Sequence, residues 1–218
     1  MDLYPLFNSL RIAAISSVLV FFLGIFLAYY ARKLPRAFKG LLDVVLTLPL
    51  VLPPTVCGYF LLMVFGLRRP AGMFLAQYGI KFVMTWYGGI LAAAVVAFPL
   101  MYRTARGAFE SFNEDLASAG RTLGLSNTRI FWQITMPYCK DGIIAGTVLA
   151  FARGLGEYGA TSMLIGYTPG KTATISTTVY QLWRTNDDRG AFIWVMINVA
   201  LSAIVLITVN LFERKKRK

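Results

Sequence analysis

The sequence contains no histidine, and only two cysteines, Cys57 and Cys139, occur among its 218 residues. Without histidine the chain cannot build a histidine-ligated metal site or a Ser-His or Cys-His catalytic pair. The cysteines lie in or next to apolar segments without metal-ligand spacing, which is typical of small packing residues and not of a disulfide framework. The motifs Gly-x-Ser-x-Gly and His-Glu-x-x-His are absent as well. These absences favour a protein that is not itself an enzyme.

Charged residues are also scarce. They make up 15% of the chain, whereas a soluble domain carries roughly 25%. The uncharged runs between them are long enough to cross a bilayer at about 1.5 Å of rise per residue. The predicted spans are residues 12–31, 44–67, 82–102, 142–166 and 190–212. We therefore expect an all-α membrane protein with five transmembrane helices in one domain, residues 1–218.

Positive charge is distributed unevenly between the predicted loops. Lys and Arg place 14 cations on the side of the C-terminus and seven on the side of the N-terminus. Cytoplasmic loops retain Lys and Arg, so the bias predicts the N-terminus outside and the C-terminus inside. The cations lie at the ends of apolar runs and not along one soluble face, which argues against nucleic-acid binding despite a net charge of +12.

The inner segment between the third and fourth spans, residues 113–137, has helical features of its own. Asn113 is a plausible N-cap, and apolar or small residues recur at helical spacing behind it. They are Leu116, Ala119, Gly120 and Leu123. Gly124 can adopt the left-handed conformation that ends a helix, and Ser126 can cap a second helix that continues to Pro137. The pattern predicts helix–glycine–helix.

The apolar stripe on this loop has two interpretations. Its small residues suit close approach by another protein surface. The alternative is a helix that lies on lipid headgroups, but such helices usually present larger apolar residues, often Trp or Phe. The composition therefore favours docking.

Residues 114–124, followed by Phe131, Ile134 and Met136-Pro137, resemble the cytoplasmic loop of bacterial and archaeal ABC importer permeases. In that family the loop is the coupling helix, which fits a cleft on the ATP-hydrolysing subunit. The resemblance implies a coupling site made of Glu114, Leu116, Ala117, Ala119, Gly120, Arg121, Leu123, Gly124 and Leu125. One departure is Ala117, which stands where the family usually has a glutamate.

Two charges lie inside the predicted fourth span. Arg153 and Glu157 are four residues apart, so on a continuous helix they share one face. An unpaired charge at that depth is costly, by about 2.5 kcal/mol or more, and mutual pairing is the simplest compensation. The pair is either a structural ion pair that orients the helix or a polar element of a transport pathway.

The predicted second span contains the run Pro53-Pro54-Thr55. Prolines inside a span break backbone hydrogen bonds, which is tolerated where neighbours or a water-lined cavity satisfy the freed carbonyls. These three residues are therefore pathway candidates, and the alternative is a packing kink.

Three segments resemble the oxyanion branch of the ABC permeases, which covers molybdate, tungstate and sulfate. Residues 151–161 resemble the fourth-span signature of that branch, and residues 48–56 and 168–172 look like the molybdate permease. Substrate alternatives within the branch are tungstate and sulfate. Alternatives from other classes are a passive channel or scaffold, and a membrane enzyme built around the charged pair.

The resemblance also implies partners and a location. The chain would lie in the cytoplasmic membrane of a prokaryote, with two ATP-binding subunits on its inner face and a periplasmic or extracellular oxyanion-binding protein outside. ATP and magnesium would belong to the ATPase, with no cofactor in this chain, because Gly170-Lys171-Thr172 lacks the glycine a phosphate-binding loop needs at Ile165. Five spans are few to enclose a gated route, so we expect a homodimer.

Overall fold

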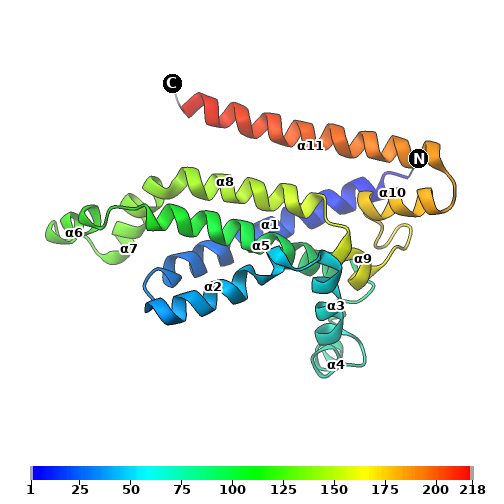
Figure 1. The fold of residues 1–218 in the computed structure, drawn as a ribbon, viewed down its shortest axis with the longest axis horizontal. Helices are drawn as coiled ribbons and strands as arrows, with labels where there is room; N and C mark the ends of the chain where they lie inside the picture. The colour runs from blue at the N-terminus through cyan, green and yellow to red at the C-terminus, as the bar shows by residue number, and fades with distance from the viewer. Residues whose placement is uncertain (1, 217–218) are drawn as a thin grey trace.

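The computed structural model describes residues 2–216, and within that range the chain is helical without a β-strand. Four long helices set the shape in Figure 1. They are α1 (Tyr4–Ala31), α5 (Trp86–Glu110), α8 (Met136–Leu155) and α11 (Asp188–Lys216). The all-helical prediction is confirmed.

Shorter helices connect the long ones and form both ends of the molecule. They are α2 (Arg36–Val51), α3 (Pro54–Phe65), α4 (Pro70–Gln77), α6 (Glu114–Thr122), α7 (Asn127–Ile130), the π-helical turn η1 (Phe131–Thr135), α9 (Gly159–Ile165) and α10 (Ile175–Arg184). Helices α6 and α7 lie at one end of the long axis, whereas α9 and α10 lie toward the other (Figure 1).

Helix α5 is the centre of the fold and packs against α1, α2, α8 and α9. Its buried face alternates small residues such as Ala93 and Ala97 with the large side chains of Met101 and Tyr102, all of them inaccessible to solvent. Small residues let helix backbones approach closely, which is how membrane helices gain van der Waals contact. The core is thus a set of helices held at short distance around α5.

Three helices are long and apolar enough to cross a membrane, namely Tyr4–Ala31, Trp86–Glu110 and Asp188–Ile207. They coincide with the first, third and fifth predicted spans. The second predicted span is a pair of helices, Ala37–Val51 and Pro54–Phe65, bent by 113° at its break. The fourth is divided as well, because α8 ends at Leu155 and α9 begins at Gly159. A continuous helix over 142–166 was therefore the wrong expectation.

Proline causes the first break. A residue that precedes proline is driven out of the helical region, and Leu52, before Pro53, is extended with ψ of 142°. Pro53 is itself extended, with ψ of 135°, and Pro54 then starts α3 at a position where its missing N–H is not needed. The chain consequently turns a corner within the predicted second span, residues 44–67.

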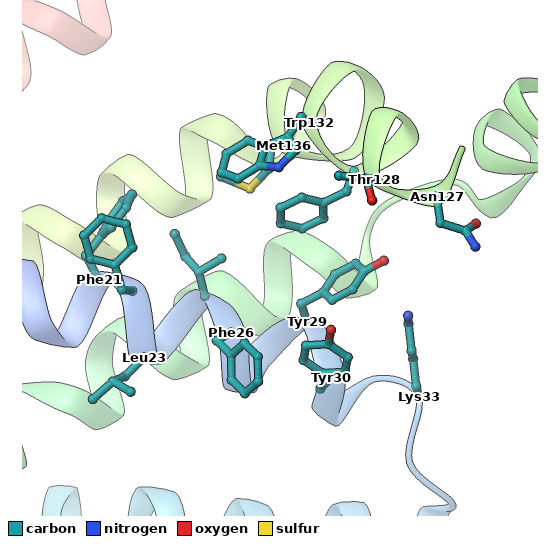
Figure 2. Close-up of a pocket in the computed structure, with 13 residues that line it drawn as sticks. Phe21, Leu23, Phe26, Tyr29, Tyr30, Lys33, Asn127, Thr128, Trp132 and Met136 are labelled. Atoms are coloured by element: carbon teal, nitrogen blue, oxygen red, sulfur yellow. The ribbon is translucent and has the colours of Figure 1, made fainter. Parts of the chain in front are cut away.

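An apolar groove lies between the second half of α1 and the segment from α7 to the start of α8, with a volume of about 670 Å³. We call it the α1–α8 groove. In Figure 2, Phe21 and Leu23 lie toward one end, whereas Lys33 and Asn127 lie at the other. Trp132 and Met136 form the wall opposite α1.

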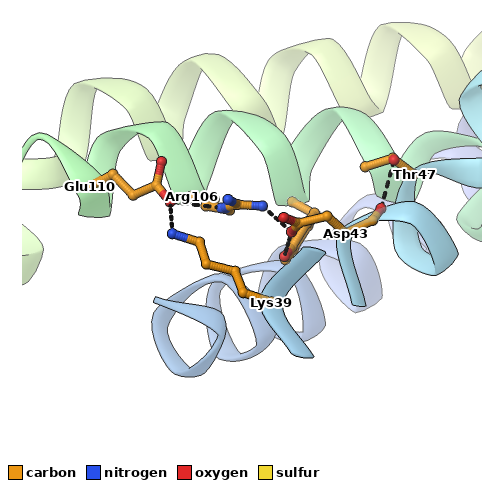
Figure 3. A network of polar contacts seen from close by, with 6 residues as sticks. Lys39, Asp43, Thr47, Arg106 and Glu110 are labelled. Atoms are coloured by element: carbon orange, nitrogen blue, oxygen red, sulfur yellow. Dashed lines mark hydrogen bonds and ion pairs between the residues drawn. The ribbon is translucent and has the colours of Figure 1, made fainter. Parts of the chain in front are cut away.

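Charged side chains fasten α2 to α5 (Figure 3). The Lys39 amine lies 2.5 Å from Glu110, and the Arg106 guanidinium contacts both Glu110 and Asp43. The Tyr102 hydroxyl donates to the same Asp43 carboxylate at 2.6 Å. Because each carboxylate has two partners, the network fixes the direction of α2 before the chain reaches its break.

Beyond the break, α3 packs on α9 at very short distance. A Cβ atom added to Gly58 would lie 2.7 Å from the Cα and 2.8 Å from the carbonyl oxygen of Ala160. Both neighbouring atoms belong to backbone, which cannot move aside as a flexible side chain would. The contact between α3 and α9 therefore requires glycine at position 58.

We predict that Gly58→Ala separates α3 from α9 and lowers stability by about 1–3 kcal/mol, the usual cost of an overpacked core. The matched control is Gly107→Ala in α5, where an added Cβ meets no atom within 4 Å. Alanine there should leave stability unchanged or raise it by up to ~1 kcal/mol. Thermal unfolding midpoints in detergent measure both, and equal midpoints would contradict the tight contact.

Candidate functional site

The two helix breaks meet in space. A Cβ atom on Gly159, at the start of α9, would lie 2.8 Å from the Cβ of Pro54 and 3.0 Å from the backbone nitrogen of Thr55. The corner between α2 and α3 therefore rests directly on the corner between α8 and α9. We call this contact the break junction, residues 51–58 and 153–160. It contains all five residues that the sequence singled out as candidates for the pathway or for helix packing.

Arg153 and Glu157 pair, but not as neighbours on one helix. Glu157 lies beyond the end of α8, so the predicted shared helix face is wrong. The pair forms nonetheless, with 2.6 Å between Arg153 Nη1 and Glu157 Oε2. The chain turn after Leu155 brings the carboxylate back onto the arginine.

The Glu157 carboxylate has a second partner. Its Oε1 atom accepts a hydrogen bond of 2.7 Å from the backbone N–H of Ala160, in the first turn of α9. Its side chain is only 1% exposed, whereas that of Arg153 is 30% exposed. One buried carboxylate thus holds the last turn of α8 and the first turn of α9 at once, and the arginine alone reaches the surface.

The corner between α2 and α3, on the other side of the junction, is largely exposed. Pro53 and Thr55 are exposed, Pro54 is half-buried, and Val51 is 83% exposed. Thr55 is the polar side chain among them. A surface of this kind offers a ligand a hydroxyl and apolar atoms, with the half-exposed Arg153 on the same junction.

The loop between α5 and α8 has the predicted helix–glycine–helix form. Asn113 caps α6 by accepting a 2.8 Å hydrogen bond from the Asp115 N–H, and Gly124 has a φ of +80°. Ser126 caps α7 through the N–H of Arg129 at 3.3 Å. The Leu125 N–H donates to the carbonyl of Gly120 at 3.0 Å, which closes the end of α6.

The predicted apolar stripe of α6 is divided between two surfaces. Leu116 is 42% and Leu123 81% exposed, and Ala119 is exposed as well. Gly120 instead faces inward, where a Cβ would lie 3.1 Å from Ile134 and 3.2 Å from Ile130. The exposed part forms what we call the α6 face, made of Leu116, Ala119 and Leu123.

Two small residues, Ala117 and Gly120, lie on the inner side of α6. Ala117, at which the resemblance led us to expect a glutamate, is 3% exposed, so a carboxylate there would be buried. Glu114 forms the ion pair of this helix instead, at 2.7 Å from Arg32 at the end of α1. The exposed Arg121 donates from Nε to Asn127 at 3.4 Å.

Sequence reasoning missed the residues that pack against the inner side of α6 in the loop between α5 and α8. Ile130 and Phe112 are buried beneath α6, and Arg32 holds Glu114. The residue Arg32 is visible in the sequence only as one of many cations at a span end. Its role depends on a partner 82 positions away, which no local pattern reveals.

Residues 2–216 contain no group of three or more Cys, Asp or Glu side chains gathered closely enough to hold a metal ion. The chemistry available at the junction is binding and release through hydrogen bonds, apolar contact and one guanidinium.

Comparison with known proteins identifies the class. Residues 20–218 match the family described as "Binding-protein-dependent transport system inner membrane component". The molybdenum transport system permease protein ModB of Escherichia coli K12 is 43% identical over 212 residues, which cover 96% of this chain and 93% of that protein. The sulfate transport system permease protein CysT of Salmonella typhimurium is 28% identical, over 95% of this chain and 75% of its own length.

Among solved structures, a bacterial ABC transporter that imports the acidic polysaccharide alginate has a chain with a TM-score of 0.78. That match covers 99% of this chain and 80% of the other at 17% identity, so it shows the fold alone. Together, the family match and the helical fold establish the class of protein. The chain belongs to the inner membrane components of binding-protein-dependent transport systems and is a permease.

The ion pair at the junction makes a testable prediction. Arg153→Met leaves the buried Glu157 carboxylate without its cation, which costs about 3–5 kcal/mol. The double variant Arg153→Met with Glu157→Gln removes the charge and keeps an amide oxygen that accepts from Ala160. It should therefore be more stable than Arg153→Met alone. Thermal unfolding of the single and double variants gives the coupling energy, and additive losses would show that the pair does not act as a unit.

Proposed function

We propose that this chain is the membrane permease of an ATP-driven importer for molybdate. The observation that carries the proposal is the 43% identity to the molybdenum permease ModB along 96% of the chain. The identity to a sulfate permease is lower, at 28%. Sulfate and tungstate are therefore the second candidates, because all three are tetrahedral dianions.

In this proposal the permease is a homodimer that crosses the cytoplasmic membrane of a prokaryote with its N-terminus outside. Each copy has five spans, of which the second and fourth are the broken ones. Two ATPase subunits, which carry ATP and magnesium, bind the inner face, and a periplasmic or extracellular binding protein delivers the oxyanion to the outer face. The charge bias of the loops supports the orientation.

The α6 face is the proposed contact with the ATPase. Its three residues are exposed although apolar or small, and Leu123 at 81% exposure has no partner side chain that shields it. An exposed apolar face at the end of a membrane protein supports docking of another subunit. Arg32 ties the start of α6 to α1, so movement of the docked helix would be passed to the first span.

The break junction is the proposed wall of the pathway. Pro53 and Thr55 are exposed, the Arg153 side chain is 30% exposed, and the buried Glu157 carboxylate orients the arginine. A guanidinium that is already paired attracts an oxyanion weakly. Weak attraction suits a permease, because an anion held tightly inside the membrane would leave slowly.

ATP binding would bring the two ATPase subunits together and draw the two α6 faces with them. The two copies of the permease would then rotate as rigid bodies, and the pathway would open toward the outer face. A passive channel would not need the α6 face, which is why the importer is favoured over that second class.

The coupling role predicts that Leu123→Asp abolishes co-purification of the ATPase subunit, since a carboxylate replaces the most exposed apolar side chain of the α6 face. The matched control is Ser118→Asp, an exposed position on the far side of the same helix. It introduces the same charge and should retain the ATPase. Pull-down from mild detergent, scored against total permease, distinguishes them, and equal retention by both variants would refute the docking role.

The substrate is tested by uptake of radiolabelled molybdate into cells that carry the importer. We expect excess sulfate to compete weakly, because the identity to the sulfate permease is lower than that to the molybdenum permease. Competition by excess tungstate tests the other candidate substrate. Strong inhibition of molybdate uptake by sulfate would instead identify the chain as a sulfate permease. Uptake that continues without ATP would instead support the passive channel.

A further inference from the structure

The α1–α8 groove continues into a second, polar cavity. This cavity has a volume of about 570 Å³ and lies between the ends of α1 and α5 and the loop helix α6. Tyr29, Lys33 and Asn127 line both spaces, so one continuous surface runs from apolar to charged. Each volume falls in the range of about 300–1,000 Å³ that ligand sites usually have.

The apolar part is built from large side chains that lack cover. Phe22 is 65%, Phe26 57% and Trp132 62% exposed. Trp and Tyr are enriched where a membrane meets water, and Tyr29, Tyr30 and Trp132 mark that level here. This half of the surface fits an acyl chain.

The polar part has an excess of positive charge. Four cations line it, namely Arg32, Lys33, Lys39 and Arg121, against the two carboxylates Glu110 and Glu114. Both carboxylates are already engaged: Glu114 pairs with Arg32 at 2.7 Å, and Glu110 pairs with Lys39 at 2.5 Å. Lys33 and Arg121 have no carboxylate partner within the described residues, so their charge is available to an anion.

Lys33 is held at the point where the two parts meet. Its amine lies 4.4 Å from the centre of the Tyr29 ring and 5.4 Å from that of Tyr30. Figure 2 shows the side chain directed toward Asn127 across the mouth of the groove. The aromatic contacts keep the cation at the boundary between the apolar and the polar part, as a headgroup phosphate requires.

We propose that this surface binds one anionic phospholipid from the leaflet on the side of the coupling loop. Its acyl chains lie along Phe22, Phe26 and Trp132, and its phosphate lies between Lys33 and Arg121. The bound lipid spans α1, the coupling helix α6 and the start of α8. The inference depends on membrane insertion and not on the substrate. Because the resemblance also assigns Arg121 to the coupling site, the single variant Lys33→Gln carries the test that is separate from ATPase docking.

The experiment uses the full chain, with the subunits that co-purify, in nanodiscs of equal phosphatidylglycerol and phosphatidylcholine. After mild extraction, native mass spectrometry counts the molecules of each lipid that remain bound. Wild-type protein should retain phosphatidylglycerol in clear excess. Loss of one cation weakens attraction to an anionic lipid about fivefold, so Lys33→Gln should lower that excess about fivefold and Lys33→Gln with Arg121→Gln about 25-fold. Lys33→Arg should restore it.

Two further variants separate charge from apolar contact. The matched control Lys171→Gln removes an exposed lysine at the other end of the molecule and should change nothing. Trp132→Ala should lower retention of both lipids equally and leave the preference for phosphatidylglycerol intact.

Several results would overturn the proposal. Equal retention of the two lipids by the wild type would do so, as would an unchanged preference in Lys33→Gln. Displacement of phosphatidylglycerol by excess inorganic phosphate would identify a site for a soluble anion. Conversion of the Trp132→Ala permease to a smaller oligomer would show that a second copy of the chain covers the groove.

Discussion

The close contact between two broken helices is the constraint on which the rest of this permease depends. Gly58 leaves no space for a side chain above Ala160, and Gly159 leaves none beside Pro54. The two corners are therefore in direct contact, with no room for a methyl group between them. The ionic network of Asp43 and Arg106 sets the direction from which α2 enters, and the Glu157 carboxylate sets the direction in which α9 leaves.

The loop between α5 and α8 also depends on small residues that allow close packing. Small residues at Ala117 and Gly120 let α6 lie close to Ile130 and Ile134, and this leaves Leu116 and Leu123 on the outside. A larger side chain on the inner face would lift the helix from its support. The loop can therefore present a rigid face to a partner although it lies outside the bundle, because its own chain packs beneath it.

Much of this architecture was predictable from the sequence. Uncharged runs located the long helices, and Asn113, Gly124 and Ser126 located the caps of the loop, since capping depends on neighbours within four residues. The turn at Glu157 was not predicted, because a spacing of four favours one helix face and Gly156, which ends α8, is one of several glycines in that run. The α1–α8 groove could not be predicted from the sequence either, since its two walls are about a hundred positions apart in the chain and come together only by packing.

The break junction has a consequence for the electrical barrier of the cell. A helix that stops within the bilayer leaves carbonyl and amide groups that need water or protein as partners. Water at that depth would let small ions follow the same route, and the membrane potential would drive them through it. On the proposed pathway, the resting permease would therefore have to keep water out of the junction. If the junction lines the pathway as proposed, the tight fit of Pro54 on Gly159 would exclude water on one side and would limit leak of protons or sodium.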